Sequence, residues 1–463
     1  MDINPEIFRG FSIRGVVGVD FDAAAVKDIG RGIGTWFRQH AAKTIVTGYD
    51  VRLSSPQLHE ALCEGLVLTG INVIDIGLTP TPMLNFSVGH FSADGGVMVT
   101  ASHNTAKYNG LKICSHRTVY GSDLEDIHRL VAARRFEIAS GNVEKSNPAE
   151  AYLQAISQRI SIKHPLRVVV DGGNGANGLL VPRLLRRLGC EVTEIHCNAD
   201  GNFPARGPDP TKEGATDALC QAVVSAKADI GLAFDGDGDR VVLVDENGQK
   251  VSGDLALMLL FDDVLSVSHN KKIVYEVLCS MAVPEFILSH GGTPIQAPSG
   301  YAYVHNLLLE HNAQTGGETS GHIFLLDQDF KFDDAILASA RLVQILSLED
   351  EGLSKRLSRY PVYHASPEYR PSCPDKYKTE IVRSLGEEFR REGYPLEEVD
   401  GVRVDFGNAW ALIRQSNTQP ALSLRFESKI SHQHMNQVKE AVLKRLMREY
   451  QSRQMPWQDD IFN

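Results

Sequence analysis

The chain is poor in cysteine and has no long apolar run. Its seven cysteines are scattered and none forms a CxxC pair, so neither a disulfide framework nor a cysteine-ligated zinc site is expected. The longest apolar run covers residues 255–261, far fewer than the roughly 20 residues of a membrane-spanning helix. The opening MDINPEIFRG lacks the apolar core of a signal peptide. These absences predict a cytoplasmic protein with no membrane partner.

Positive charge is also scarce. Lysine and arginine number 47 against 58 aspartates and glutamates, and the formal net charge is −11. No run rich in lysine and arginine occurs, whereas a nucleic-acid-binding protein usually carries a basic face. We therefore expect no nucleic-acid partner, and a phosphate-binding site would have to gather its cations locally.

Strand-like and helix-like segments alternate over most of the 463 residues, a length that fits about three or four domains. Strands are expected at 44–47, 73–76, 97–100, 167–170, 230–234 and 273–277. This alternation predicts parallel, doubly wound sheets with helices on both faces. After the proline-rich segment 366–374, paired strands at 401–406, 409–414 and 423–427 lead into an amphipathic helix. The chain is thus of the α/β class, with three doubly wound α/β domains expected at 1–150, 151–254 and 255–368 and a smaller α+β domain at 369–463.

Polar loops lie near the ends of three of these segments, at 100–104, 235–240 and 316–322. Ligands of open parallel sheets bind beyond the carboxyl ends of the strands. We therefore expect the functional groups of this protein in these loops.

The loop at 235–240 reads DGDGDR. Asp235, Asp237 and Asp239 can converge on one hard cation if the intervening glycines let the loop curl. A calcium loop of the EF-hand kind is the alternative, because Glu246 is the twelfth residue from Asp235. That alternative is opposed by Arg240, which stands where the EF-hand has glycine, and by flanks that resemble strands rather than helices. The loop therefore predicts a metal site, and Arg240 suits one that also holds a phosphate.

The loop at 100–104 reads TASHN, and Lys112 follows closely. Ser102 at the end of a strand can act as a nucleophile or as a phosphate carrier. His103 and Lys112 could assist it by charge or by proton transfer. The sequence has no GxSxG elbow, so a hydrolase of that type is not supported. Taken alone, these residues fit an ordinary turn equally well.

Two further segments carry groups suited to a sugar phosphate. Glu318, Ser320 and His322 alternate in the loop GGETSGH, so they would face one side and could bind vicinal sugar hydroxyls. The segment RQSNTQP carries four groups that could bind an anion through a guanidinium, hydroxyls and backbone N–H groups, namely Arg414, Ser416, Asn417 and Thr418. Either segment alone is as typical of a surface turn.

Together and in this order, the four motifs resemble the α-D-phosphohexomutase family, and the bacterial phosphomannomutase/phosphoglucomutase branch within it. Residues 8–15 are similar to the first-strand signature of that family, and Asn417 and residues 329–334 fit the branch. The resemblance implies four domains around a central cleft. It also implies an isomerase-class phosphotransferase that interconverts hexose 1-phosphate and hexose 6-phosphate of mannose or glucose. The reaction would proceed through a phosphoserine and a hexose 1,6-bisphosphate, which also serves as activator, in a monomer or dimer.

The resemblance assigns a role to each motif. Ser102 would carry the phosphoryl group and, with Asp235, Asp237 and Asp239, would bind Mg²⁺. Four groups would act beside the transferred phosphate, with Lys112 and Arg14 serving proton transfer or the transition state, and Arg240 and His103 next to the phosphate. Seven groups would bind substrate, namely Glu318, Ser320, His322, Arg414, Ser416, Asn417 and Thr418.

The sequence departs from the family pattern at four positions. Leu278 and Tyr301 stand where the family tends to have basic residues, and Thr105 and Gln419 replace a usual proline and glutamate. The loss of two cations should weaken phosphate contacts or change the preferred substrate. Two alternatives therefore stay open: a mutase for another phosphosugar, such as N-acetylglucosamine phosphate, and a non-catalytic sugar-phosphate-binding relative.

Overall fold

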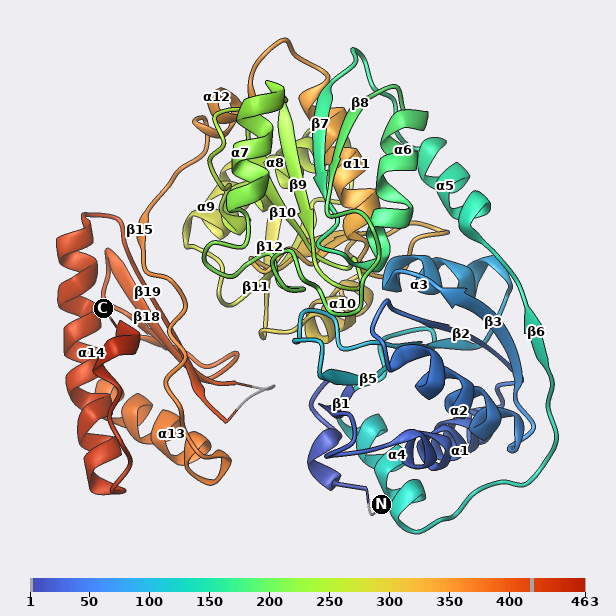
Figure 1. Ribbon diagram of the computed structural model, residues 1–463. Coiled ribbons are helices and arrows are strands. Elements are labelled where there is room, and N and C mark those ends of the chain that lie inside the picture. The colour runs from blue at the N-terminus through green and yellow to red at the C-terminus, as the bar shows by residue number, and fades with distance from the viewer. Residues whose placement is uncertain (1–2, 417–419, 463) are drawn as a thin grey trace.

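The computed structural model describes residues 3–416 and 420–462, and its strands form four sheets (Figure 1). The first sheet has the order β1-β5-β4-β2-β3-β6. Its strands are β1 (Ile13–Val16), β2 (Thr44–Tyr49), β3 (Asn72–Leu78), β4 (Gly95–Val99), β5 (Tyr108–Cys114) and β6 (Val143–Lys145). Its helices are α1 (Ala23–Gln39), α2 (Ser55–Val67), α3 (Thr81–His90) and α4 (Ser122–Ala132), after the 3₁₀ turn η1 (Pro5–Ile7).

The central strands β2 and β4 of this sheet are buried on both faces, as is typical of strands covered by helices on both sides. Ile45 and Val97 pack in one core with the helices α1, α2 and α4. The next residues along the two strands, Val46 and Met98, point the other way and pack beneath α3. Alternation of side chains along each strand thus produces the three-layer arrangement.

The second and third sheets have the orders β10-β9-β7-β8 and β12-β11-β13-β14. Their strands are β7 (Arg167–Asp171), β8 (Glu191–Ile195), β9 (Ile230–Phe234), β10 (Val241–Asp245), β11 (Lys272–Glu276), β12 (Thr293–Ala297), β13 (Thr315–Gly317) and β14 (Ile323–Leu325). Their helices are α5 (Ala149–Ser157), η2 (Ala176–Leu179), α6 (Val181–Arg187), α7 (Asp217–Ala226), α8 (Gly253–Val267), α9 (Ala282–Ser289), α10 (Tyr301–Glu310), α11 (Ala335–Leu346) and α12 (Leu353–Leu357).

One hydrophobic cluster runs through both of these sheets, from Met83 of α3 to Tyr360. Within it, α8 and α11 contact each other, and α11 also contacts β9, β10 and β14. The second and third sheets therefore share a core, and the expected boundary after Asp254 lies in the first turn of α8. The boundaries at 150, 254 and 368 stay predictions.

The fourth sheet is separate and antiparallel, in the order β15-β19-β18-β17-β16, and it stands at the left in Figure 1. Its strands are β15 (His364–Ala365), β16 (Leu396–Glu397), β17 (Val402–Asp405), β18 (Ala409–Gln415) and β19 (Leu422–Ser428). Its helices are α13 (Asp375–Arg391) and α14 (His432–Ser452), and the chain closes in η3 (Asp459–Phe462). The expected α+β character is confirmed.

The prediction of purely parallel sheets is wrong in one respect. In each of the first three sheets a parallel strand turns into an antiparallel neighbour, in the pairs β4–β5, β9–β10 and β13–β14. The connections at 100–107, 235–240 and 318–322 are too short for the crossover of a dozen or more residues that a parallel pair needs. Each predicted functional loop is therefore a hairpin loop at the carboxyl end of a parallel strand. Among the described residues, no helix combines the length and apolarity required to cross a bilayer.

Candidate active site

Two of these hairpin loops meet at Ser102. The Ser102 hydroxyl donates to Asp235 Oδ2 at 2.8 Å, so the loop after β4 contacts the loop after β9. Ser102 is only 2% exposed and has a φ of +49°. A non-glycine residue adopts this left-handed conformation only where its surroundings impose it, and such residues gather at functional sites.

Arg52 imposes the shape of the serine loop. Its five side-chain N–H groups all donate: to the carbonyls of Ser102 (2.8 Å), Asn104 (2.6 Å), Thr105 (2.7 Å) and Tyr108 (2.9 Å), and to Asp50 Oδ2 (2.9 Å). Asp50 in turn accepts a hydrogen bond from the Thr100 hydroxyl at 2.8 Å. Both members of this ion pair are fully buried, so the loop is fixed by charge-assisted bonds that water does not screen. Neither Asp50 nor Arg52 was predicted as a site residue, although a charged pair directly after a buried strand was the available signal.

The aspartate loop forms a buried group of oxygen ligands. Asp235, Asp237 and Asp239 are at most 1% exposed, and one oxygen of each lies within 4.8 Å of the others. Asp237 Oδ1 and Asp239 Oδ1 have no hydrogen-bond partner among the described residues. A buried carboxylate oxygen without a donor is costly, and a hard divalent cation is the ligand that would satisfy it. The three residues therefore fit a hard divalent cation, and the metal site that the DGDGDR loop predicts is possible here.

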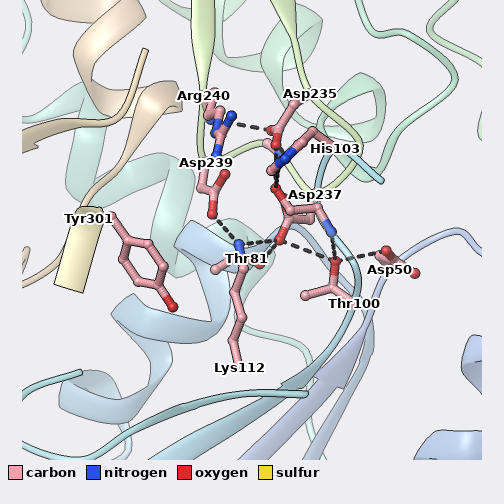
Figure 2. Close-up of polar contacts among 12 residues, drawn as sticks. Asp50, Thr81, Thr100, His103, Lys112, Asp235, Asp237, Asp239, Arg240 and Tyr301 are labelled. Atoms are coloured by element: carbon pink, nitrogen blue, oxygen red, sulfur yellow. Dashed lines mark hydrogen bonds and ion pairs between the residues drawn. The ribbon is translucent and has the colours of Figure 1, made fainter. Parts of the chain in front are cut away.

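Lys112 provides the positive charge beside these carboxylates. Its Nζ donates to Asp237 Oδ2 at 2.8 Å and also to Asp239 Oδ2, as Figure 2 shows. Burial opposes the charge of Lys112, but the two carboxylates outweigh it and raise the pKa of the ammonium above its usual value. Burial and the neighbouring charges of Asp239 and Asp237 raise the pKa of Asp235. The site thus carries more negative charge than one lysine offsets, which again suits a bound cation.

Arg240 is oriented by a histidine and an aspartate behind it. Arg240 Nε donates to His322 Nε2 at 2.8 Å, and His322 Nδ1 lies 2.6 Å from Asp333 Oδ2. Because Nε2 accepts, the proton of His322 is on Nδ1 and is donated to Asp333. The role of His322 as a substrate ligand stays a prediction; in the structure its Nε2 contacts Arg240 and its Nδ1 contacts Asp333. This link joins the aspartate loop to the loop after β13.

His103 and Arg14 both contact the serine loop. His103 Nδ1 is 3.2 Å from Ser102 Oγ, and burial together with the charges of Arg240 and Arg14 holds the pKa of His103 well below its ordinary value. Arg14 Nη1 donates to Asn104 Oδ1 at 2.9 Å, while its buried Nε has no partner in the part of the chain that the structure describes. His103 is therefore neutral, and Arg14 retains a donor for an anion.

The loop after β13 is held by two buried glutamates. Glu318 Oε1 accepts from Gly300 N at 2.7 Å, and its Oε2 is 3.4 Å from Ser320 Oγ. Glu276, at the end of β11, accepts from Ser299 Oγ at 2.6 Å and from Thr319 N at 3.1 Å. Burial and the charge of Glu318 raise the pKa of Glu276 to about 8. Glu276 was not predicted, since a single acid at a strand end gives no signal in sequence.

The segment at 414–418 is described only in part. Arg414 and Ser416 are each 4% exposed, and Lys378 Nζ donates to the Ser416 carbonyl at 2.7 Å. Asn417 and Thr418, predicted as further phosphate ligands, lie outside the described residues, as does Gln419. Arg414 belongs to the fourth sheet, and its Nε donates to Asp400 Oδ2 at 2.7 Å.

Leu278 and Tyr301, at the two positions where the resemblance predicts basic residues, both have structural partners. Leu278 is 6% exposed and packs with Val277, Trp410 and Leu412, where the third and fourth sheets meet. The ring of Tyr301 stacks on His322 with centroids 5.3 Å apart, and its hydroxyl donates to the Phe11 carbonyl at 3.3 Å. Both positions therefore serve packing between sheets.

Comparison with known proteins covers nearly the whole chain. Four family models match in order: phosphoglucomutase/phosphomannomutase alpha/beta/alpha domain I at residues 5–136, domain II at 150–248, domain III at 252–363 and the C-terminal domain at 370–445. A phosphomannomutase/phosphoglucomutase of Pseudomonas putida is 37% identical over 97% of both chains. That of Pseudomonas aeruginosa strain PAO1 is 36% identical over 91% of both. The crystal structure of a phosphoglucomutase/phosphomannomutase family protein from Burkholderia thailandensis has a TM-score of 0.91 at 33% identity, covering 96% of this chain and 98% of that one.

Proposed function

Since the chain belongs to the phosphoglucomutase/phosphomannomutase family, we propose that it interconverts hexose 1-phosphate and hexose 6-phosphate, with mannose or glucose as the hexose. It is then an isomerase-class phosphotransferase. The observation that supports this most strongly is the hydrogen bond from the Ser102 hydroxyl to Asp235, within a buried group of three aspartates. A phosphate carrier, an oxygen-lined cation site and Lys112 converge there.

Ser102 would carry the phosphoryl group, and Asp235, Asp237 and Asp239 together with that phosphate would hold Mg²⁺. When bound there, Mg²⁺ offsets the negative charge of the phosphoryl group. The unpaired oxygens of Asp237 and Asp239 support this assignment. With the cation bound, Lys112 would no longer be the only group that offsets the charge of these carboxylates, and its own charge could act on the phosphate.

In the first transfer, the free hydroxyl of a bound hexose phosphate attacks the phosphorus and the bond to Ser102 Oγ breaks, giving a hexose 1,6-bisphosphate. Lys112, Arg14 and Arg240 bring positive charge to this point, and such charge is worth most in a buried site. His322 contributes by fixing Arg240. His103, which its surroundings keep neutral, is suited to accept the proton of the attacking hydroxyl and to pass it to the departing Ser102 Oγ, 3.2 Å from its Nδ1.

In the second transfer, the bisphosphate has turned over and returns its other phosphate to Ser102. Glu318 and Ser320 would hold sugar hydroxyls in either orientation, while Arg414, Ser416, Asn417 and Thr418 would hold the phosphate that is not reacting. Added glucose 1,6-bisphosphate would restore the phosphoserine whenever the intermediate escapes. We also propose a cytoplasmic location, which the seven free cysteines favour.

The experiment is a coupled assay with Mg²⁺ and catalytic glucose 1,6-bisphosphate, run in parallel on mannose 1-phosphate, glucose 1-phosphate and N-acetylglucosamine 1-phosphate. The Ser102→Ala variant is the control for contaminating mutases. Turnover of the first two substrates by wild type only is expected. Turnover of N-acetylglucosamine 1-phosphate alone would identify an N-acetylhexosamine phosphate as the substrate in place of mannose or glucose phosphate. Turnover of none of the three would support a sugar-phosphate-binding protein instead.

A further inference from the structure

One carboxylate oxygen joins the fourth sheet to the third. Asp400 Oδ2 accepts from Arg414 Nε at 2.7 Å and from the backbone N–H of Ser299 at 2.9 Å. Arg414 lies in β18, whereas Ser299 lies in the turn between β12 and α10. The side chains of Asp400 and Arg414 are 16% and 5% exposed. A charge-assisted hydrogen bond this sheltered is strong and geometrically specific.

The chain is built locally to place Asp400 against Arg414. Gly401 has a φ of +78°, and a Cβ there would lie 2.4 Å from the carbonyl oxygen of Ile413 and 2.7 Å from Cβ of Arg414. Only glycine allows β17 to begin this close to β18. In the register of the pair, Val402 stands opposite Ile413, so Gly401 comes against Arg414. The close approach at Gly401 therefore brings the residue before it, Asp400, within reach of the Arg414 side chain.

The same turn connects onward to the sugar loop. The Ser299 hydroxyl donates to Glu276 Oε1 at 2.6 Å, and Gly300 N donates to Glu318 Oε1 at 2.7 Å. Glu276 holds the loop from its other side through Thr319 N at 3.1 Å. Asp400 is thus the group through which the phosphate-binding arginine of the fourth sheet contacts the turn that holds Glu318.

We propose that Asp400 is a positioning residue of the mutase reaction: it fixes the plane of the Arg414 guanidinium and ties the phosphate clamp to the sugar-binding loop. The inference rests on the proposed function of Arg414. A guanidinium that is already oriented can hold two phosphate oxygens without first losing its own freedom. Because the second contact of Asp400 is to another sheet, the arginine is oriented when the fourth sheet is docked over the site.

The test compares Asp400→Asn, which keeps an acceptor for Ser299 N but loses the ion pair, with Asp405→Asn. Asp405 is an exposed carboxylate at the end of β17 that accepts from Gly407 N. Asp400→Asn should raise KM for glucose 1-phosphate about tenfold, the size of one charge-assisted hydrogen bond, and leave kcat within about threefold. Asp405→Asn should change neither. An unchanged KM in Asp400→Asn would overturn the proposal.

A double-mutant cycle separates positioning from a merely structural role. If Asp400 acts through Arg414, the KM of Asp400→Ala combined with Arg414→Ala should equal that of Arg414→Ala alone within about twofold. The proposal would be refuted if the KM increases of the two single variants multiplied in the double variant. A fall in kcat and melting temperature without a change in KM would refute it as well. Calorimetric binding of glucose 1,6-bisphosphate needs no turnover, and Asp400→Asn should weaken it about tenfold. If the wild-type protein has no mutase activity, the proposed function is wrong. If wild type and Asp400→Asn bind glucose 1,6-bisphosphate equally well, the role of Asp400 is wrong.

Discussion

Replacing Arg52 with lysine should disable the serine loop while keeping its charge. Arg52 donates all five of its side-chain N–H groups to the loop and to Asp50. Lysine has three donors on one nitrogen, so at least two of these buried acceptors lose theirs. Each buried acceptor left without a donor costs about 1–3 kcal/mol. Opening of the loop at 100–108 should therefore become easier by about 2–6 kcal/mol.

The catalytic consequence follows from the position of Ser102. A displacement of about 1 Å at a reacting group can cost about a hundredfold in rate, so kcat of Arg52→Lys should fall by about that factor. The assay combines initial rates at saturating hexose 1-phosphate with hydrogen exchange of the amides at 100–108. Arg129→Lys, at a side chain that is 71% exposed, is the matched control. If Arg52→Lys has the kcat and the amide exchange rates of wild type, Arg52 does not hold the serine loop in place.

Three further results are expected. Asp237→Asn should abolish turnover at any Mg²⁺ concentration. A chelator should inactivate wild type, and added Mg²⁺ should restore it; a wild type that stays active in chelator would contradict the metal site. Leu278→Lys should not improve KM, because it buries an ammonium beside Trp410, and it should cost about 2–5 kcal/mol in thermal unfolding, against less than about 1.5 kcal/mol for Leu278→Met. The pKa of Glu276 is raised from 4.5 to about 8. Between these two pH values Glu276 holds its proton in the folded protein but not in the unfolded chain, so the free energy of unfolding falls as pH rises across this range. Glu276→Gln should remove this slope, which melting temperatures at about pH 5 and pH 8 would measure; an unchanged slope would assign it elsewhere.

The sequence predicted the groups that carry their own local signal. Asp235, Asp237 and Asp239 stand at every second position beside glycines, and Ser102 follows a buried strand. Short apolar runs also indicated central strands of the first three sheets, such as β4, β9 and β11. What the pattern could not indicate was that these loops are hairpins, because loop length decides between a turn and a crossover only once the next strand is recognised.

The supporting residues were missed because their partners are remote in sequence. Arg52 acts on carbonyls about fifty residues further along the chain, and no periodicity predicts such a contact. Asp400 acts between two sheets whose docking the sequence does not encode in any local pattern. The packing role of Leu278 could not be predicted either, because its partners Trp410 and Leu412 are remote in sequence.

The proposed reaction requires Ser102 to carry the phosphate that moves between hexose positions. The direct test is peptide mass spectrometry of Ser102 after incubation with glucose 1,6-bisphosphate and Mg²⁺, before and after addition of excess mannose 1-phosphate. We expect one phosphoryl group on Ser102, its loss or exchange on addition of the sugar, and formation of mannose 6-phosphate. A serine that stays unmodified throughout, or mannose 6-phosphate formed equally well by Ser102→Ala, would contradict it.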